Sequence, residues 1–180
     1  SIAILILARC SRPAEEVTLR IFATDVHRRS LAVAAAGFYA SDTVANVRSE
    51  WLRRFFSRRG SGFQVVPQVR RVIIFSPHDV LRDPPFTKLH LVSCRNLLIY
   101  LRREAQAQVV HNFAFALHPA GHLLLGSSES TVGNDDAFAP VDRDARLFRR
   151  RGGDDQPVVE QPRGSLGAAM RVQITQRGRA

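Results

Sequence analysis

Short apolar runs that alternate with helix-like segments constrain most strongly what this chain can fold into. LRIFATD (19–25), VRRVIIF (69–75), LHLVSC (89–94) and GHLLLG (121–126) have the length and composition of buried strands. Strands that are apolar almost throughout are typical of parallel sheets covered on both faces. The alternation therefore predicts an α/β sheet with helices on both faces.

The segments between these runs carry helical signals. An alanine-rich stretch over 27–36 precedes Gly37, which predicts a helix with a glycine C-cap. Apolar residues fall at helical spacing over about 47–57 and again over 101–117. Residues 1–9 are apolar nearly throughout and suit the later turns of a buried helix.

Two pairs of short runs predict hairpins. The run at 63–66 and the run at 69–75 follow a Gly-Ser-Gly turn and could pair as a small hairpin subdomain over about 60–75, and the runs at 137–141 and 146–148 flank a polar turn. We therefore expect one domain over 1–150. Residues 151–180 are rich in Gly, Pro, Gln and Arg, which predicts a disordered tail or linker.

The composition limits the partners. Lys and Arg number 26 against 16 Asp and Glu, a formal net charge of +10, which favours an acidic partner such as nucleic acid or a glutamate-rich protein surface. Basic runs interleaved with aromatics and recognised nucleic-acid motifs are missing from the sequence, so we expect no nucleic-acid partner. The apolar run at 2–8 is too short to span a bilayer, so we expect no membrane insertion.

Cysteine and histidine spacing indicates neither a disulfide framework nor a metal site. Cys10 and Cys94 lie far apart and are typical of free thiols in a reducing compartment, here the cytoplasm. His118 and His122 are four residues apart, but a proline and a glycine between them prevent one helix face from presenting both.

Polar residues follow the predicted strands where ligands bind in such sheets, beyond the carboxyl ends. Asp25 ends one strand, Asp79 follows another, and Arg95 and Asn96 follow a third. Asp25 could accept hydrogen bonds from ribose hydroxyls or could instead cap the following helix. Asp79 could accept from an adenine amino group or serve only as a turn residue. Arg95 could bind an anion or could be a solvated cation at a strand end.

The order of five motifs resembles one family. ATD, FSPHDVLRDPPF, LVSCRNLLIY, LHPAGHLLLGSSES and FAPVDRDARLFRR, within residues 1–150, are similar to chemoreceptor glutamate methyltransferases of the CheR type, especially those of large fused sensory proteins with a methylesterase segment. The resemblance implies a Rossmann-like class I methyltransferase sheet with a small β-hairpin insertion. It also implies methyl transfer from S-adenosylmethionine to glutamate side chains of a receptor or sensor protein, giving methyl esters in bacterial chemotaxis and signal transduction.

The resemblance also implies residue roles in cofactor binding. Asp25 matches the acid that holds the cofactor ribose, and Asp79 and Val80 match an Asn-Leu pair beside the adenine. Arg95 and Asn96 match a pair that lines the cofactor and the substrate glutamate.

The resemblance implies that two residues are catalytic. Arg95 could fix the incoming carboxylate by a charge-assisted hydrogen bond. Tyr100 matches a tyrosine near the reacting methyl group, although it could equally be a core aromatic with its hydroxyl at the surface.

Several features depart from the family pattern. The family's helical N-terminal domain, its first strand and its glycine-rich loop would precede Ser1, so we expect an N-terminally truncated domain that lacks the first strand and binds cofactor poorly. Asp79 stands where asparagine is usual, and His90 stands where aspartate is common. The alternatives are a non-catalytic binding module of a fused sensory protein or a truncated inactive fragment. A nucleic-acid methyltransferase is a weaker alternative, because no Asn-Pro-Pro-aromatic motif is present.

Overall fold

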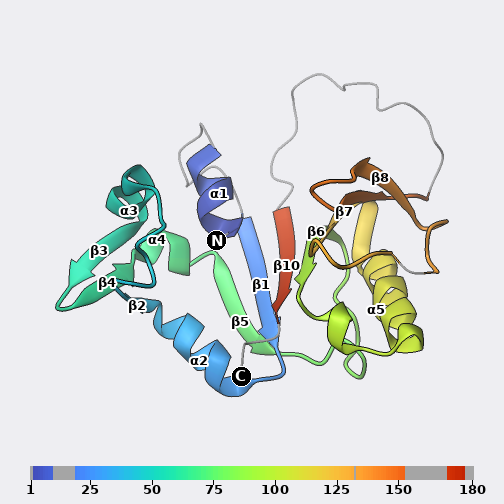
Figure 1. Ribbon diagram of the computed structural model, residues 1–180, viewed down its shortest axis with the longest axis horizontal. Coiled ribbons are helices and arrows are strands. Elements are labelled where there is room, and N and C mark those ends of the chain that lie inside the picture. Colours follow the sequence, from blue (N-terminus) through green and yellow to red (C-terminus); the bar gives the residue numbers. More distant parts are fainter. Residues whose placement is uncertain (1, 10–18, 132, 153–169, 177–180) are drawn as a thin grey trace.

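The computed structural model describes residues 2–9, 19–131, 133–152 and 170–176. Within these ranges the chain forms a seven-stranded sheet of order β5-β1-β10-β6-β7-β9-β8 and a separate three-stranded sheet of order β2-β4-β3 (Figure 1). In chain order the elements are α1 (Ile2–Arg9), β1 (Leu19–Asp25), α2 (Arg28–Ala36), β2 (Phe38–Ala40), α3 (Ser49–Phe55), β3 (Phe56–Arg59), β4 (Gly62–Val65), α4 (Pro67–Arg70), β5 (Ile73–Pro77), β6 (Leu89–Arg95), the 3-10 helix η1 (Leu98–Tyr100), α5 (Arg103–Ala116), β7 (Leu117–Leu125), β8 (Phe138–Asp142), β9 (Leu147–Arg150) and β10 (Met170–Gln176).

The large sheet has a parallel part and an antiparallel edge. Strands β5, β1, β10, β6 and β7 run parallel, while β9 and β8 form the predicted hairpin and join antiparallel to β7. Parallel strands place all their carboxyl ends at one edge of the sheet. The α/β architecture predicted from the sequence is thus confirmed, and it fixes where the polar residues that follow β1, β5 and β6 must lie.

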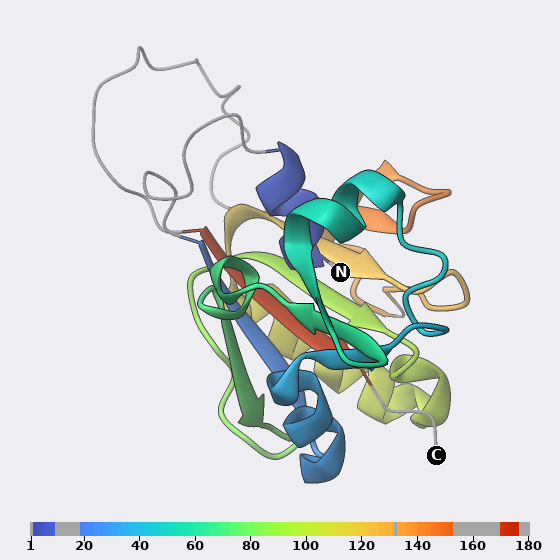
Figure 2. The same ribbon diagram turned by 90° about the vertical axis from the view of Figure 1, so that its left-hand side faces the viewer.

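The strand at the centre of the sheet comes from the C-terminal end of the chain. β10 pairs parallel with β1 on one side and with β6 on the other, as the neighbouring ribbons in Figures 1 and 2 show. The expectation of disorder over 151–180 therefore does not hold for 170–176, and residues 153–169 and 177–180 lie outside the described residues. The sheet therefore has no gap between β1 and β6 where the first strand was expected to be missing. β10 lies there and supplies backbone hydrogen-bond partners to both neighbours.

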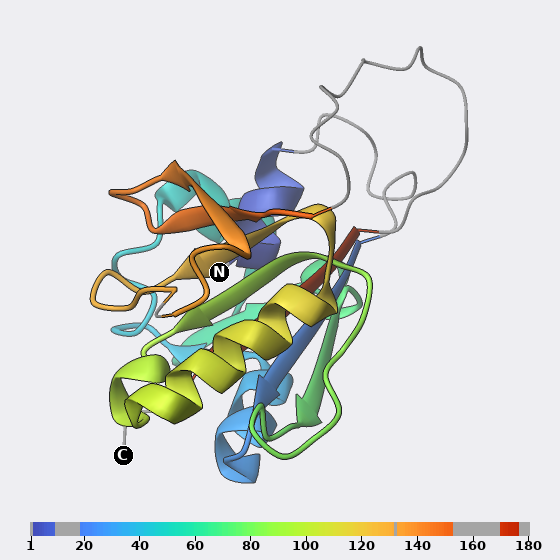
Figure 3. The same cartoon turned by 90° about the vertical axis from the view of Figure 1, so that its right-hand side faces the viewer.

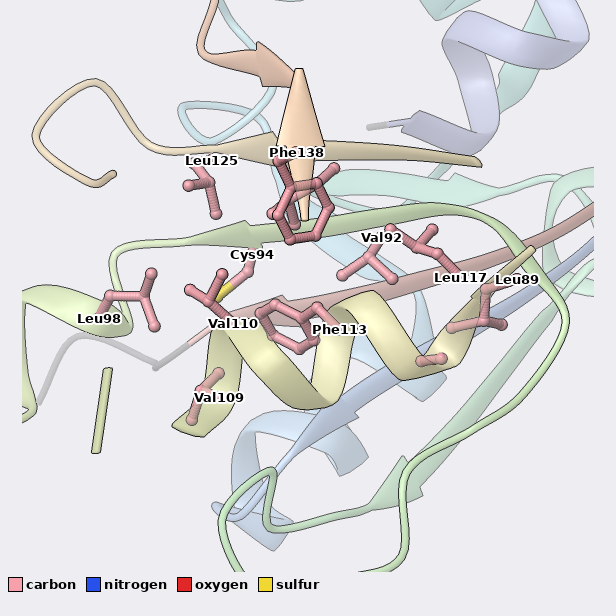
Figure 4. Packing of buried hydrophobic residues seen from close by; sticks show 12 residues of the cluster. Leu89, Val92, Cys94, Leu98, Val109, Val110, Phe113, Leu117, Leu125 and Phe138 are labelled. Atoms are coloured by element: carbon pink, nitrogen blue, oxygen red, sulfur yellow. The ribbon is translucent and has the colours of Figure 1, made fainter. Parts of the chain in front are cut away.

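Helices cover both faces of the parallel strands. α5 lies across one face, as Figure 3 shows, and packs its buried side chains against alternate residues of β6 and β7. Figure 4 shows this cluster, in which Val110 and Phe113 of α5 lie against Cys94 of β6 and Phe138 of β8. Each large apolar side chain buried in this way contributes roughly 1.5–3 kcal/mol.

A second cluster lies on the opposite face. Ala3, Ile4 and Leu7 of α1 pack with Ile21 of β1 and with Phe55 at the end of α3. The spacing of the three α1 residues puts them on one helical face, which explains how a helix of eight residues is held on the sheet. Helices on both faces thus agree with the prediction. No helix in the described ranges has the length and apolar character that crossing a bilayer requires.

The small sheet differs from the expected hairpin. β4 pairs antiparallel with β3 and β2, whereas the run at 69–75 divides between the helical turn α4 and β5, which pairs with β1. The predicted pairing of 63–66 with 69–75 is therefore wrong. Pro67 is the cause, because a proline favours the first position of a helical turn and this turn redirects the chain into the large sheet.

One predicted helix ends as the sequence indicates, and another is shorter than predicted. Gly37 follows α2 with φ of 63°, and its N–H bonds to the carbonyl oxygens of Val33 and Ala34. Such a left-handed C-cap strongly favours glycine. α3 spans Ser49–Phe55, shorter than the predicted 47–57, because the chain becomes extended at Phe56 and enters β3.

We predict that Ile174→Pro unfolds or strongly destabilises the chain. Every backbone N–H of a strand flanked on both sides belongs to one ladder or the other, and proline removes that donor from β10. Thermal or urea unfolding should show a loss of at least about 1–3 kcal/mol, because the ladder partner of the lost N–H is left unsatisfied. Ile174→Val keeps the N–H and should cost less than about 1.5 kcal/mol. Equal stability of the proline variant and the natural chain would contradict a central β10.

Candidate cofactor and substrate site

The carboxyl edge of the parallel strands gathers the residues predicted from the sequence. Asp25 at the end of β1 is in register with Pro77 at the end of β5, and Arg95 at the end of β6 is in register with Gln176 at the end of β10. β1 and β6 are two strand spacings apart, about 10 Å. The edge therefore carries two polar groups, one around Asp25 and one around Arg95, separated by the width of β10.

The first group is centred on Asp25. Only 8% of this residue is exposed, and its Oδ1 accepts a hydrogen bond from the backbone N–H of His27 at 2.8 Å. His27 is the N-cap residue of α2, so Asp25 supports the entry to that helix without being its cap. No described residue donates to Oδ2, which leaves one carboxylate oxygen for a ligand.

Asp79 and Val80 follow β5 in a tight turn. The Oδ1 atom of Asp79 accepts from the N–H of Leu81 at 2.9 Å, and the N–H of Asp79 donates to Oδ2 of Asp83 at 2.8 Å. These bonds show Asp79 in the turn role that the sequence left open. Val80 is partly buried against the α5 cluster, and its carbonyl accepts from Nδ2 of Asn112 at 3.2 Å.

His78 links this turn to Asp25. Its backbone N–H donates to the Asp25 carbonyl at 3.2 Å, and its ring lies 4.8 Å from the ring of Phe86. Burial lowers the pKa of His78 below its ordinary value, although the nearby carboxylates of Asp83 and Asp79 act in the opposite direction. The side chain is therefore favoured in its neutral form at neutral pH.

The second group is the turn that follows β6. Arg95 and Asn96 are both exposed, and Asn96 adopts the left-handed region with φ of 57°. Asparagine tolerates this conformation better than most residues with a side chain. Among the described residues, no carboxylate lies within ion-pair distance of Arg95, so its guanidinium can take up an external anion.

A cavity of about 450 Å³ opens beside Arg95 on the α1 face of the sheet. Its wall comes mainly from apolar residues of α1, β1, β5 and β7, with Ser93 of β6 and Tyr39 of β2 as polar members. Of the residues predicted from the sequence, Arg95 lines this cavity, and Asp25, Asp79, Val80 and Asn96 do not. The predicted set thus shares an edge of the sheet, and Arg95 is its member in the wall of this cavity.

Tyr100 ends η1, the short helix after the Asn96 turn. Its side chain is 61% exposed, so the alternative of a core aromatic does not describe it. The tyrosine lies on the segment that Arg95 and Asn96 begin, which keeps it on the same edge of the sheet.

A buried carboxylate that the sequence did not single out holds this turn. Glu129 is 4% exposed, and its Oε1 accepts from the N–H groups of Leu97 and Leu98, each at 2.9 Å. Its Oε2 accepts from the N–H of Gly126 at 2.7 Å. The signal in the sequence is an acidic residue in a Ser-Glu-Ser triplet directly after an apolar strand that ends in glycine.

Cys94 lies just before the turn and faces the α5 cluster. It is fully buried, and burial raises the pKa of its thiol, with a further contribution from the negative charge of Glu129. A neutral thiol in this position acts as a small apolar side chain in the core. The described part of the chain contains no group of three histidine, cysteine or acidic residues able to hold a metal ion.

Comparison with known proteins shows the family of this chain. The sequence profile described as "CheR methyltransferase, SAM binding domain" matches residues 1–147. This chain belongs to the CheR methyltransferase family. The matched part is the SAM-binding domain, so the resemblance drawn from the motifs is confirmed, and with it the Rossmann-like class I sheet of a SAM-dependent methyltransferase family.

Relatives of the CheR family agree with this assignment. An uncharacterized 104.1 kDa protein of Rhodobacter capsulatus is 36% identical over 180 residues, which is 100% of this chain and 19% of that protein. Chemotaxis protein methyltransferases of Vibrio parahaemolyticus and Vibrio cholerae are 35% and 34% identical over 78% and 72% of this chain. The chain spans only 53% and 48% of those two proteins.

One solved structure shares a broad similarity of shape. The N-methyltransferase NodS of Bradyrhizobium japonicum, in complex with S-adenosyl-l-homocysteine, aligns with a TM-score of 0.43 and 16% identity over 83% of this chain and 86% of that chain.

We predict that Gly126→Ala loosens the turn that Glu129 holds. A Cβ at position 126 would lie 2.6 Å from Oε2 of Glu129, so the carboxylate must move away from its three donors. Thermal unfolding should show a loss of roughly 1–3 kcal/mol. Ser127→Ala, at the exposed neighbouring position, is the control and should have little effect. An unchanged midpoint for Gly126→Ala would show that the carboxylate is not fixed where the structure has it.

We predict that His78 makes stability depend on pH. Because the pKa of His78 is lowered in the folded chain, the unfolded chain binds more protons as the pH falls below 6.5. Its contribution is complete above pH 6.5 and is lost as the pH falls from there towards the folded pKa. Unfolding measured between pH 5 and 8 should show a smaller decrease for His78→Gln than for the natural chain. Parallel curves for the two proteins would contradict this assignment.

Proposed function

We propose that this chain transfers a methyl group from S-adenosylmethionine to glutamate side chains of a chemoreceptor-like protein, giving methyl esters. The observation that carries the proposal is the convergence of Asp25, Asp79, Arg95 and Asn96 on the carboxyl edge of a CheR-family sheet. This edge is where ligands bind in open α/β sheets. The names of the Vibrio relatives support the chemotaxis setting.

The residues at this edge suit the chemistry of a nucleoside cofactor. Asp25 presents one oxygen that no described residue engages, which suits ribose hydroxyl donors. Val80 offers a partly buried apolar surface, and Asn96 offers an exposed amide with both donors and an acceptor. S-adenosylmethionine, when bound, supplies a methyl group activated on a cationic sulfonium. We assign Asp25 to the ribose, Asp79 and Val80 to the adenine, and Arg95 and Asn96 to the remainder.

The substrate needs no general base in this scheme. A glutamate carboxylate has a reference pKa of about 4.3 and is ionised at neutral pH. Arg95 lines the cavity, has no carboxylate partner among the described residues, and can hold such a carboxylate by charge-assisted hydrogen bonds. The work of the protein is therefore to orient the anion and exclude water. Tyr100, exposed on the same segment, is assigned to the outer wall of the reacting position.

The charge of the chain supports an acidic protein partner. A net charge of +10 attracts a glutamate-rich surface and accelerates encounter with it. Cys94 carries a free thiol, which is consistent with a reducing compartment. We therefore place the reaction in the cytoplasm, with a receptor or sensor protein as the substrate.

A non-catalytic binding module is the second candidate. The bonds that hold Asp79 within its own turn favour it, because Oδ1 is engaged by Leu81 and the carboxylate offers no amide donor to an adenine. In this alternative the sheet is retained for protein contacts, and loss of Arg95 leaves its cellular role intact.

We predict that Arg95→Ala lowers methyl-ester formation at least tenfold, which corresponds to about 1.4 kcal/mol of lost stabilisation. The assay measures transfer of radiolabelled methyl to receptor glutamates by the product of the whole reading frame that contains this chain. Arg103→Ala removes a similarly exposed arginine in the first turn of α5 and should leave the rate unchanged. Equal rates for the natural protein and Arg95→Ala would remove Arg95 from the reaction, and absence of any transfer would favour the binding module.

A further inference from the structure

We propose that Glu129 is a positioning residue, whose buried carboxylate sets the conformation of the turn that presents Arg95, Asn96 and Tyr100. The proposal rests on the proposed function for its catalytic consequence, and on the hydrogen bonds of Glu129 for its structural part. Glu129 itself is assigned no contact with substrate or cofactor.

The carboxylate is held by backbone groups rather than by a cation. No lysine, arginine or histidine of the described residues forms an ion pair with Glu129, although 96% of the residue is removed from solvent. A buried anion is costly unless hydrogen bonds replace its hydration. Three N–H donors at 2.7–2.9 Å meet that requirement. Such charge-assisted bonds are roughly twice as strong as bonds between neutral groups.

The three donors come from two different loops. Leu97 and Leu98 follow β6, and Gly126 follows β7, so the carboxylate ties the carboxyl ends of two adjacent strands together. The N–H of Leu98 belongs to a residue that is 2% exposed, so water cannot easily replace the carboxylate as its partner. Removing the acceptor therefore leaves a buried donor unsatisfied and favours a different course of the chain.

Asn96 carries the left-handed backbone of this turn. It stands directly before the two bonded N–H groups and adopts φ of 57°, a conformation that costs energy for a residue with a side chain. The bonds to Leu97 and Leu98 offset this cost. Arg95 is the last residue of β6 and Tyr100 ends η1 after the held segment, so a relaxed turn loosens the end of β6 at Arg95 and moves Tyr100.

Glutamine is the closest neutral analogue of glutamate, because an NH₂ group replaces one carboxylate oxygen. Glu129→Gln keeps an oxygen for Leu97 and Leu98 but places an amide NH₂ opposite the N–H of Gly126, where two donors face each other. The substitution preserves size and removes the charge. Glu104→Gln makes the same chemical change at an exposed position in the first turn of α5 and is the matched control.

The structural part is tested by NMR on the full chain. For Glu129→Gln we expect at least tenfold faster amide exchange at Leu97, Leu98 and Gly126, and loss of the left-handed backbone shifts of Asn96. Exchange at Val92, in the interior of β6, should stay the same, which shows that the sheet is intact. Unchanged exchange and unchanged Asn96 shifts would overturn the proposal. If Glu129→Gln does not fold, Glu129→Asp serves instead, because its shorter side chain keeps the charge but cannot reach both loops.

The functional part is tested by a double-mutant cycle with Arg95→Ala in the product of the whole reading frame. We expect Glu129→Gln to lower kcat/KM at least fivefold alone and less than twofold in the Arg95→Ala background. The effect shrinks because Glu129→Gln can misplace the Arg95 guanidinium only while that guanidinium is present. A purely structural role would lower the rate equally in both backgrounds and would overturn the positioning claim. If Arg95→Ala alone has no effect while Glu129→Gln still acts, the assigned role of Arg95 fails, and Glu129 acts through Asn96 or Tyr100.

Discussion

The carboxylate of Glu129 is the interaction on which the candidate site depends. It gathers three backbone donors from the loops after β6 and β7 and is almost fully removed from solvent. Gly126 is required beside it, since a side chain there would meet the carboxylate at 2.6 Å. We infer that the geometry of the exposed turn after β6 follows from a buried charge beside it, and the buried charge is tolerated because the backbone surrounds it with donors.

The sheet supplies the other constraint. Five parallel strands bring Asp25, Asp79 and Arg95 to one edge although the sequence separates them by 70 residues, from 25 to 95. β10 holds the two halves of this edge at a fixed separation because it pairs with both β1 and β6. α5 and α1 pack on the two faces, and the predicted polar residues Asp25 and Arg95 lie at the rim of the sheet (Figures 1 and 3).

The sequence predicted those features that depend on local patterns. The bounds of β1, the C-cap at Gly37, helix α5 and the polar ends of β1 and β6 could be read from apolar spacing and turn residues. The partner of 63–66 could not, because short strands do not encode whether the neighbour precedes or follows them. The strand at 170–176 was hidden by its polar composition, since central pairing is decided by the open edges of β1 and β6 rather than by local propensity. Glu129 was missed because its role arises only when two loops meet.

We infer that the carboxyl edge of the parallel strands, with the turn after β6 held by Glu129, receives the nucleoside of the cofactor. The most direct measurement is a crystal structure of S-adenosylhomocysteine bound to the product of the whole reading frame. We predict that the ribose hydroxyls lie within hydrogen-bond distance of the Asp25 carboxylate and that Asn96 keeps its left-handed turn beside the ligand. A nucleoside bound elsewhere, for example against the small sheet of β2, β4 and β3, would contradict the account.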